Sequence, residues 1–302
     1  MCYPLPYEGG VMARNALVLG GGGALGISWE IGLLAGLTDE GIDVAGADLI
    51  VGTSAGSVVG TQIVLGKTLS ELIAQQMEPD DGRIGTLMAG IDPSSVLQLF
   101  MRWAGVKEMT QETRAEIGAA ALAAQTVSED EWVAYFEDHL EDAAWPDRPL
   151  LLTAVDCESG AFQTWDRDSG VLLGRAVASS CAVPGLFPAV TVNGRRYTDG
   201  GVRSGTNADL ASGYDSALIV APIGARSDGI DPLLGRQART EAEELNTSGT
   251  VAELVFPDAP TLEAIGINRM DASRRGVTTH AGIAQGRALA SRLAETWAKA
   301  AA

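Results

Sequence analysis

The sequence predicts an α/β fold, with one domain built on parallel βαβ units and carrying a helical insertion. Two short apolar runs, residues 15–19 and 48–51, each pass into a glycine-containing turn and then into a stretch with helical spacing of apolar side chains. Strand, helix, strand and helix in this order are typical of a right-handed parallel βαβ unit. Similar apolar runs in the second half of the chain extend the predicted sheet.

The remaining elements follow from the same patterns. Strands are predicted at residues 150–155, 161–165, 217–221 and 251–256, with a hairpin-like stretch over 190–197. Helices are predicted over 24–39, from the second turn to about 65, and near 171–179, 233–246 and 281–301. Residues 67–145 show helical segments near 70–77, 94–104, 111–125 and 128–140 and no strong strand pattern. We therefore expect a flexible leader over 1–14 and one domain over 15–302, in which residues 67–145 form a helical cap insertion.

Charge and composition exclude several classes of function. The 302-residue chain has 21 Lys and Arg against 39 Asp and Glu, which gives a formal net charge of −18. Such a charge repels phosphate backbones, so we expect no nucleic-acid partner. The three cysteines lack zinc-ligand spacing, no uninterrupted apolar stretch reaches about 18 residues, and the first residues do not form a signal-peptide pattern. These features predict a cytoplasmic protein.

The strongest chemical signal is Gly52-Thr53-Ser54-Ala55-Gly56, between a predicted strand and a predicted helix. Its two glycines, Gly52 and Gly56, permit a sharp, strained turn that exposes the serine hydroxyl, and the helix directs its positive end toward that serine. The same string also occurs as an ordinary glycine-rich turn with a capping serine. Its position directly after an apolar strand favours a nucleophile elbow with Ser54 as the nucleophile.

A second glycine-rich turn covers residues 20–26, again between a strand and a helix. Its backbone can approach a ligand closely and leaves amide groups free for an anion. The spacing Gly-x-Gly-x-x-Gly from position 21 also fits a dinucleotide fingerprint, which makes a nucleotide-binding module one alternative. That fingerprint requires an acidic residue at the end of a second strand, and neither Asp43 nor Asp48 ends one. We favour a loop that stabilises the oxyanion of an acyl-transfer reaction.

A nucleophilic serine needs a base, and three residues are candidates. His139 lies among acidic residues on a predicted amphipathic helix, where we expect a solvated side chain. His280 follows Ser54 in chain order, as the histidine of a Ser-Asp-His triad does, and stays a candidate on that ground alone. Asp199 is better placed, because it precedes two glycines in a turn with room for a substrate, although Asp-Gly is also common in simple turns.

Together these motifs resemble the patatin-like phospholipase family. They occur in the order Gly21-Gly-Gly-Ala-Leu-Gly26, Gly52-Thr-Ser-Ala-Gly56 and Asp199-Gly-Gly201. The run over 178–188, Ala-Ser-Ser-Cys-Ala-Val-Pro-Gly-Leu-Phe-Pro, is similar to that family as well. The resemblance extends over roughly residues 15–205 and implies a three-layer α/β/α fold with a mainly parallel central sheet.

The resemblance also implies a serine acyl hydrolase that cleaves carboxylic esters of lipids through a Ser–Asp dyad. Ser54 is then the nucleophile and Asp199 the general base. The backbone amides of Gly22, Gly23 and Ala24 form the oxyanion hole, and the reaction requires no metal or organic cofactor. A non-catalytic lipid-binding scaffold with the same fold is the remaining alternative.

One position departs from the family pattern. The glycine loop of the family usually carries Arg or Lys one place before its last glycine, and this chain has Leu25 there. The change favours neutral glycerides, lysolipids or simple acyl esters over phospholipids. Arg195, Arg196 and Arg203 flank Asp199 and are candidates to replace the missing cation, although solvated charges are the ordinary expectation for such residues.

The predicted insertion carries apolar residues that could line an acyl groove or touch a membrane surface in a transient contact. We expect most of them to be buried against the core instead. They are Leu97, Leu99, Phe100, Met101, Trp103, Val106 and Met109.

Overall fold

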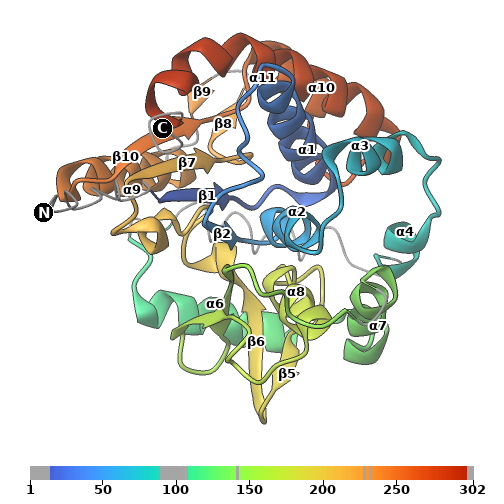
Figure 1. Ribbon diagram of the computed structural model, residues 1–302. Helices are drawn as coiled ribbons and strands as arrows, with labels where there is room; N and C mark the ends of the chain where they lie inside the picture. Colours follow the sequence, from blue (N-terminus) through green and yellow to red (C-terminus); the bar gives the residue numbers. More distant parts are fainter. Residues whose placement is uncertain are drawn as a thin grey trace, which may run out of the picture.

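A mainly parallel sheet forms the centre of the computed structural model, which describes residues 14–88, 106, 108–140, 143–226, 229–230 and 233–297 (Figure 1). Its eight strands follow the order β10-β7-β1-β2-β3-β6-β5, and β4 also pairs with β3. They are β1 (Asn15–Leu19), β2 (Leu49–Gly52), β3 (Leu150–Asp156), β4 (Phe162–Trp165), β5 (Val190–Val192), β6 (Arg195–Asp199), β7 (Ser216–Val220) and β10 (Val251–Val255). Strands β10, β7, β1, β2 and β3 are parallel, whereas β4, β5 and β6 pair antiparallel. The predicted α/β class is confirmed.

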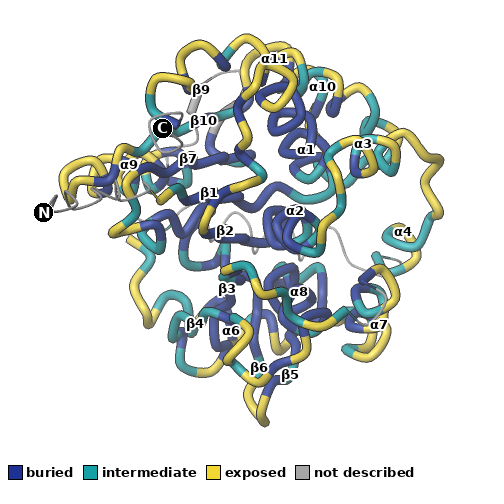
Figure 2. The backbone as a smooth tube through the Cα atoms, in the orientation of Figure 1, coloured by how far each residue is buried: buried dark blue, intermediate teal, exposed yellow. Residues whose placement is uncertain are grey.

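Apolar layers cover both faces of the sheet, because side chains alternate along its buried strands. Leu17 and Leu19 of β1 belong to a cluster shared with α1 (Gly23–Asp39), α2 (Ala55–Val64), α8 (Leu173–Ser180) and α11 (Arg275–Trp297). Ala16 and Val18 face the opposite cluster, which includes α9 (Leu234–Ser248) and the short helix η2 (Ala208–Ala211). The central strands β1, β2 and β7 and most of helices α1, α2 and α8 are accordingly buried, whereas the edge strand β10 is largely half-exposed (Figure 2). The three-layer arrangement is confirmed.

Helix α1 packs closely against α11, which also contacts β7 and β10. A Cβ atom built on Gly32 would lie 2.2 Å from the Thr279 carbonyl oxygen, and one on Gly36 would lie 2.2 Å from that of Ile283. Any larger side chain at these positions would separate the two helices. Helix α11 begins earlier than the predicted start at 281, and the short α10 (Ala259–Ile265) has no counterpart in the predicted elements, because one-sided periodicity is weak in so short a segment.

The described part of residues 67–145 is helical. It contains α3 (Leu69–Met77), α4 (Arg83–Leu87), α6 (Gln111–Ala123) and α7 (Glu129–His139). Thr68 and Ser128 begin α3 and α7 with capping boxes, which satisfy the first backbone amides of each helix. Helix α3 packs on α1 and α11, α6 on β3, and α7 on α8. That this segment acts as a cap stays a prediction.

Most of the apolar residues predicted for the cap fall outside the described residues, as does the predicted helix over 94–104. Val106 and Met109 are described, and both are half-buried. Met109 packs against the small cluster of Ile117, Val155 and Val202. None of the described helices is both long and apolar enough to cross a membrane. The remaining short elements are β8 (Ala225–Arg226), β9 (Gly229–Ile230), η1 (Gly200–Val202) and η3 (Ala272–Arg274).

Candidate active site

Two strand ends meet along one edge of β3 and bring the predicted elbow and aspartate together. Gly52, the last residue of β2, pairs with Leu152, and Asp199, the last residue of β6, pairs with Ala154. Strand β4 occupies the other edge of β3 at both positions, so β2 and β6 share one edge. Strands β2 and β6 run toward each other along this edge. Their last residues pair with positions two residues apart on β3, which corresponds to about 7 Å along the strand. This register makes Ser54 and Asp199 neighbours.

Ser54 lies in a strained turn between β2 and α2. Its backbone has φ 53° and ψ −114°, a conformation that residues other than glycine rarely adopt. The glycines on either side permit it: a Cβ atom on Gly56 would lie 2.1 Å from the Leu19 carbonyl oxygen, and one on Gly52 would lie 2.6 Å from the Ser57 Cα atom. The turn therefore has the geometry expected of a nucleophile elbow.

The end of α8 holds the elbow from a third direction. The Ser54 amide donates to the Ser180 hydroxyl at 3.1 Å. The Ser54 carbonyl accepts hydrogen bonds from the Ser57 hydroxyl at 2.6 Å and from the Cys181 thiol at 3.3 Å. Sequence reasoning assigned no role to Ser180 or Ser57, although Ser180 lies in the run over 178–188 that resembled the family. The strained backbone is thus fixed by side chains from two helices.

Asp199 is a buried carboxyl group beside the elbow, with only 3% of its surface exposed. Its Oδ1 atom accepts a hydrogen bond from the Gly201 amide at 2.7 Å, and its own amide donates to the Ala182 carbonyl at 3.0 Å. Burial raises the pKa of Asp199 from 3.8 to about 7, while the nearby Ser54 hydroxyl and the hydrogen bond from the Gly201 amide partly oppose that rise. A carboxyl group with this pKa can accept a proton near neutral pH.

Asn207 connects the elbow with the Asp-Gly-Gly turn. Its side-chain amide donates to the Thr53 hydroxyl at 3.0 Å and to the carbonyls of Gly200 and Ser204 at 3.3 and 2.9 Å. Thr53 in turn shares a 2.8 Å hydrogen bond with Thr153 of β3. Sequence reasoning missed this network, because polar residues scattered over three segments carry no local pattern. It ties together the residues before the serine and after the aspartate.

The glycine loop after β1 is anchored beside the serine. The Gly20 amide donates to the Val220 carbonyl and the Gly21 amide to the Gly205 carbonyl, both at 2.9 Å. A Cβ atom on Gly21 would lie 3.5 Å from the Ser54 Cβ atom, so the loop and the serine are in contact range. Glycine at position 21 keeps a side chain from coming between the loop and the serine.

Three successive amides follow at the beginning of α1. Within the described part of the chain, the amides of Gly22, Gly23 and Ala24 donate no hydrogen bond. Unpaired amides at the start of a helix of this length carry partial positive charge and suit an anion. The loop thus presents three amides without a partner, and their role as an oxyanion hole stays a prediction.

The acidic residues weighed for a dinucleotide fingerprint lie away from this loop. Asp48 accepts a hydrogen bond from the Asn15 amide at 2.7 Å, at the start of β1, whereas the glycine loop follows the end of that strand. Asp43 accepts a hydrogen bond from the Gly46 amide at 2.9 Å in the turn before β2. Neither carboxylate is positioned to bind a ribose next to the glycine loop.

Neither histidine is partnered with the serine. His139 is exposed at the end of α7, where its Nδ1 atom lies 2.6 Å from the Tyr135 carbonyl oxygen. His280 is exposed on α11, and its Nδ1 atom lies 2.8 Å from the Gly276 carbonyl oxygen. The Ser54 hydroxyl lies near enough to Asp199 to lower the pKa of that carboxyl group. No cluster of three or more His, Cys, Asp or Glu side chains among the described residues could hold a metal ion.

Leu25 is fully buried, so this position of the glycine loop presents no side chain to a substrate. The three arginines considered as substitutes are engaged with other groups. Their partners are Asp156 for Arg195, the Ala189 carbonyl for Arg196, and Asp209 for Arg203. Each partner belongs to the hairpin region or the segments beside it, so these arginines stabilise that region.

Comparison with known proteins agrees with the motifs. The protein-family model for patatin-like phospholipases matches residues 17–212, more than half of the chain. Uncharacterized NTE family proteins of Mycobacterium bovis and Mycobacterium tuberculosis are each 26% identical over 248 residues, which cover 80% of this chain and 57% of theirs. This chain thus spans little more than half the length of those relatives.

Among solved structures, the crystal structure of VipD from Legionella pneumophila aligns with a TM-score of 0.43 and 12% identity, covering 93% of this chain and 67% of that chain. The family match covers the glycine loop, the serine elbow and the Asp-Gly-Gly turn together, and it confirms the resemblance found from the motifs. The chain therefore belongs to the patatin-like phospholipase family.

Proposed function

We propose that the protein is a serine acyl hydrolase that cleaves carboxylic esters of lipids, with Ser54 as nucleophile and Asp199 as general base. The observation that carries this proposal is the buried Asp199 carboxyl group beside a serine on a strained elbow, with a pKa that burial raises and the Ser54 hydroxyl partly lowers. A serine hydroxyl is a weak nucleophile until an adjacent base accepts its proton. Asp199, with its pKa raised to about 7, has that capacity at neutral pH.

The reaction proceeds in two halves. Asp199 accepts the proton of the Ser54 hydroxyl as Oγ attacks the ester carbonyl carbon, and the carbonyl oxygen becomes an oxyanion. The amides of Gly22, Gly23 and Ala24 stabilise that charge. The intermediate then collapses, the bond to the alcohol oxygen breaks, and Asp199 returns the proton to the departing alcohol. Water attacks the acyl-enzyme by the same route and releases the carboxylic acid.

Active-site labelling with a fluorophosphonate tests this assignment. We expect the wild type to be labelled and to hydrolyse p-nitrophenyl esters. Ser54→Ala should abolish labelling, and Asp199→Asn should reduce both labelling and hydrolysis strongly. His280→Ala is the matched control, since it removes the competing base and should leave both readouts unchanged.

Three results would contradict the proposal. Labelling that survives Ser54→Ala would remove the serine as nucleophile. Labelling that is lost in His280→Ala but kept in Asp199→Asn would replace the dyad with a histidine-based mechanism. A wild type that binds lipid but neither labels nor hydrolyses any ester would support the non-catalytic scaffold instead.

The proposed substrate is a lipid or another acyl ester, and the proposed location is the cytoplasm. Cys157 and Cys181, the cysteines in the described residues, are buried and unpaired, which agrees with a reducing compartment. The net charge of −18 opposes lasting adsorption to anionic membranes, so contact with a membrane surface would be transient.

A further inference from the structure

Residues 203–208, the segment that follows the Asp-Gly-Gly turn, contact all three motifs of the candidate site. The Gly205 carbonyl accepts a hydrogen bond from the Gly21 amide of the glycine loop at 2.9 Å. The Asn207 side chain donates to the Thr53 hydroxyl next to the serine at 3.0 Å. It also donates, at 3.3 Å, to the carbonyl of the first glycine in the Asp-Gly-Gly turn. The segment therefore joins three turns that lie far apart in the sequence.

The turn around Asn207 needs support from outside the segment. Its backbone is left-handed, with φ 52° and ψ 40°, which is uncommon for a residue other than glycine and persists where the surroundings hold it. The Ser204 hydroxyl accepts hydrogen bonds from the amides of Thr206 and Asn207 at 3.2 and 3.1 Å. These bonds shape the turn, but they span three residues at most and do not fix it relative to the sheet.

Glu241 of α9 holds this turn from a separate, packed helix. One carboxylate oxygen, Oε2, accepts hydrogen bonds from the Thr206 hydroxyl at 2.5 Å and from the Ala208 amide at 2.8 Å. Thr206 and Ala208 are the residues on either side of Asn207. Helix α9 packs on η2 and β10, with Leu245 buried in the apolar cluster on that face of the sheet (Figure 1). Hydrogen bonds to an ionised acceptor are stronger than those to a neutral one, so Glu241 is a firm anchor.

We propose that Glu241 is a positioning residue for the dyad, which acts by holding Asn207 and, through it, the relative places of the serine elbow, the aspartate turn and the glycine loop. The inference rests on the proposed function and adds a residue that acts through another instead of on the substrate. A nucleophile displaced by about 1 Å can lose about 10²-fold in rate. Removing the acceptor at position 241 should therefore lower kcat and leave KM nearly unchanged.

Two substitutions at this position separate the acceptor from the volume of the side chain. Both hydrogen bonds end on one oxygen, so Glu241→Gln can keep them, whereas Glu241→Met keeps the chain length and removes the acceptor. For a p-nitrophenyl ester we expect Glu241→Met to lower kcat about tenfold or more with KM changed less than about twofold, and Glu241→Gln to retain at least about a third of kcat. Glu244→Met, at an exposed position of the same helix, is the matched control and should leave both constants unchanged.

A residue that only stabilises the fold would lower the number of folded sites and not the turnover of each site. The sites are therefore counted by fluorophosphonate labelling to completion, well below the midpoint of thermal unfolding, and kcat is expressed per labelled site. Unchanged turnover per site in Glu241→Met, together with a lower unfolding midpoint, would overturn the proposal. A higher KM with unchanged kcat would also overturn it, because Glu241 would then serve substrate binding. Equal losses of kcat in Glu241→Gln and Glu241→Met would show that the oxygen acceptor does not carry the effect.

Hydrogen exchange makes the test independent of catalysis. We expect the Gly21 amide to exchange about tenfold faster or more in Glu241→Met than in the wild type or in Glu241→Gln, because its acceptor, the Gly205 carbonyl, is held less firmly. Amides of the central strand β7 should not change, and NMR of the full chain follows both. Faster exchange at Gly21 together with no ester hydrolysis by the wild type would refute the proposed function and leave the anchoring by Glu241 intact. Unchanged exchange at Gly21 would refute the role of Glu241, whatever the activity.

Discussion

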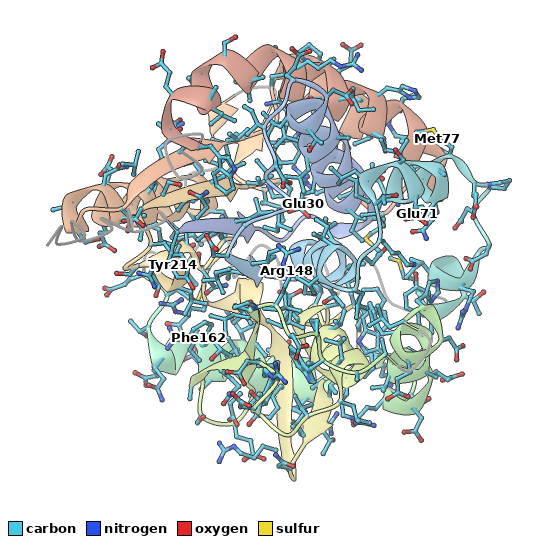
Figure 3. The ribbon with its side chains drawn as sticks, in the orientation of Figure 1. Glu30, Glu71, Met77, Arg148, Phe162 and Tyr214 are labelled. Atoms are coloured by element: carbon cyan, nitrogen blue, oxygen red, sulfur yellow. The ribbon has the colours of Figure 1, made fainter. Side chains whose placement is uncertain are left out.

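Glu30 and Asp199 are two buried carboxyl groups in very different surroundings. Glu30 lies in the middle of α1, between that helix and the sheet (Figure 3), and is fully inaccessible to solvent. Burial raises its pKa well above the ordinary value. Within the described part of the chain neither carboxyl oxygen has a hydrogen-bond partner. The Gly20 amide is close enough to oppose the shift slightly but donates to the Val220 carbonyl.

Asp199 is buried to a similar degree but is hydrogen-bonded. The Ser54 hydroxyl and the Gly201 amide both contribute to its pKa, which stays near 7. The contrast shows that a carboxyl group that is buried without hydrogen bonds stays protonated and uncharged in the core. Hydrogen bonds to the charged form return its pKa to the range where a proton can be exchanged at neutral pH.

Removing the charge of Asp199 should have the largest effect. We expect Asp199→Asn to reduce ester hydrolysis about 10²- to 10⁴-fold, because the serine loses its base. Stability should change in the opposite direction. The rise in the pKa of Asp199 from 3.8 to about 7 corresponds to a cost of about 4 kcal/mol when the group is ionised, and Asn avoids it.

Initial rates and the midpoint of urea unfolding at pH 8 measure both effects of Asp199→Asn. Asp168→Asn, at an exposed position, is the control for loss of one negative charge. A variant that keeps its activity, or that becomes less stable at pH 8, would remove the basis of the contrast with Glu30.

Removing the Asn207 network should have the next largest effect. Asn207→Ala leaves the Thr53 hydroxyl and the Gly200 carbonyl without their shared donor, so the turns that carry the serine and the aspartate are held together less firmly. We expect kcat to fall about 10- to 100-fold and the free energy of unfolding to fall by about 1–3 kcal/mol. Steady-state kinetics and urea unfolding measure the two quantities.

Asn193 provides a matched control for that substitution. Both asparagines have positive φ, 52° for Asn207 and 49° for Asn193, but Asn193 lies in the exposed hairpin turn between β5 and β6. Asn193→Ala should therefore incur a similar backbone cost without loss of activity. Equal kinetic losses in the two variants would show that the network does not position the dyad.

Activity and stability should depend on pH in opposite directions. Below pH 7, kcat/KM should fall by about tenfold per pH unit, because Asp199 must be ionised to act as a base. Stability should rise as the pH falls from about 7 toward 4, because a raised carboxyl pKa means that the folded state binds more protons than the unfolded state there. Glu30 contributes in the same direction.

Values of kcat/KM and denaturant unfolding curves, both measured between pH 5 and 8, give the pH dependence of activity and of stability. In Asp199→Asn the stability profile should become flatter over this window. A wild-type rate that is independent of pH down to 5 would mean that a group other than Asp199 controls the reaction.

Glu30→Gln should have the smallest effect on catalysis. The substitution keeps the shape of the side chain but removes its ionisation, so we expect kcat/KM to change less than about twofold. Because Glu30 resists ionisation in the folded state, Gln should stabilise the protein by about 1–3 kcal/mol above neutral pH. Thermal unfolding at pH 8 measures this gain, with Glu40→Gln, exposed at the end of the same helix, as control. A loss of activity comparable to that of Asp199→Asn would place Glu30 in the catalytic machinery and end the contrast.

Most of the fold could be predicted because its signals are local. Apolar runs predicted β1, β2, β3 and β7, the first two with a glycine turn after them, and the structure has these strands within a residue or two of the predicted bounds. The short α10 and the early start of α11 were missed, because a few residues carry too little periodicity. The elbow, the glycine loop and the Asp-Gly-Gly turn could be named as candidates since each is a contiguous motif.

The sequence by itself determined which groups were available: a serine between two glycines after a strand, a loop without side chains, and an aspartate before two glycines. Only the tertiary structure decided what these groups meet. The pairing of β2 and β6 along one edge of β3 makes Ser54 and Asp199 neighbours, and hydrogen bonding distinguishes the buried Asp199 from the equally buried Glu30. The same holds for Glu241, which reaches the segment after the Asp-Gly-Gly turn from a helix later in the chain. The physical reason is that desolvation and hydrogen bonding depend on neighbours in space, and strand register sets those neighbours over more than a hundred residues of chain.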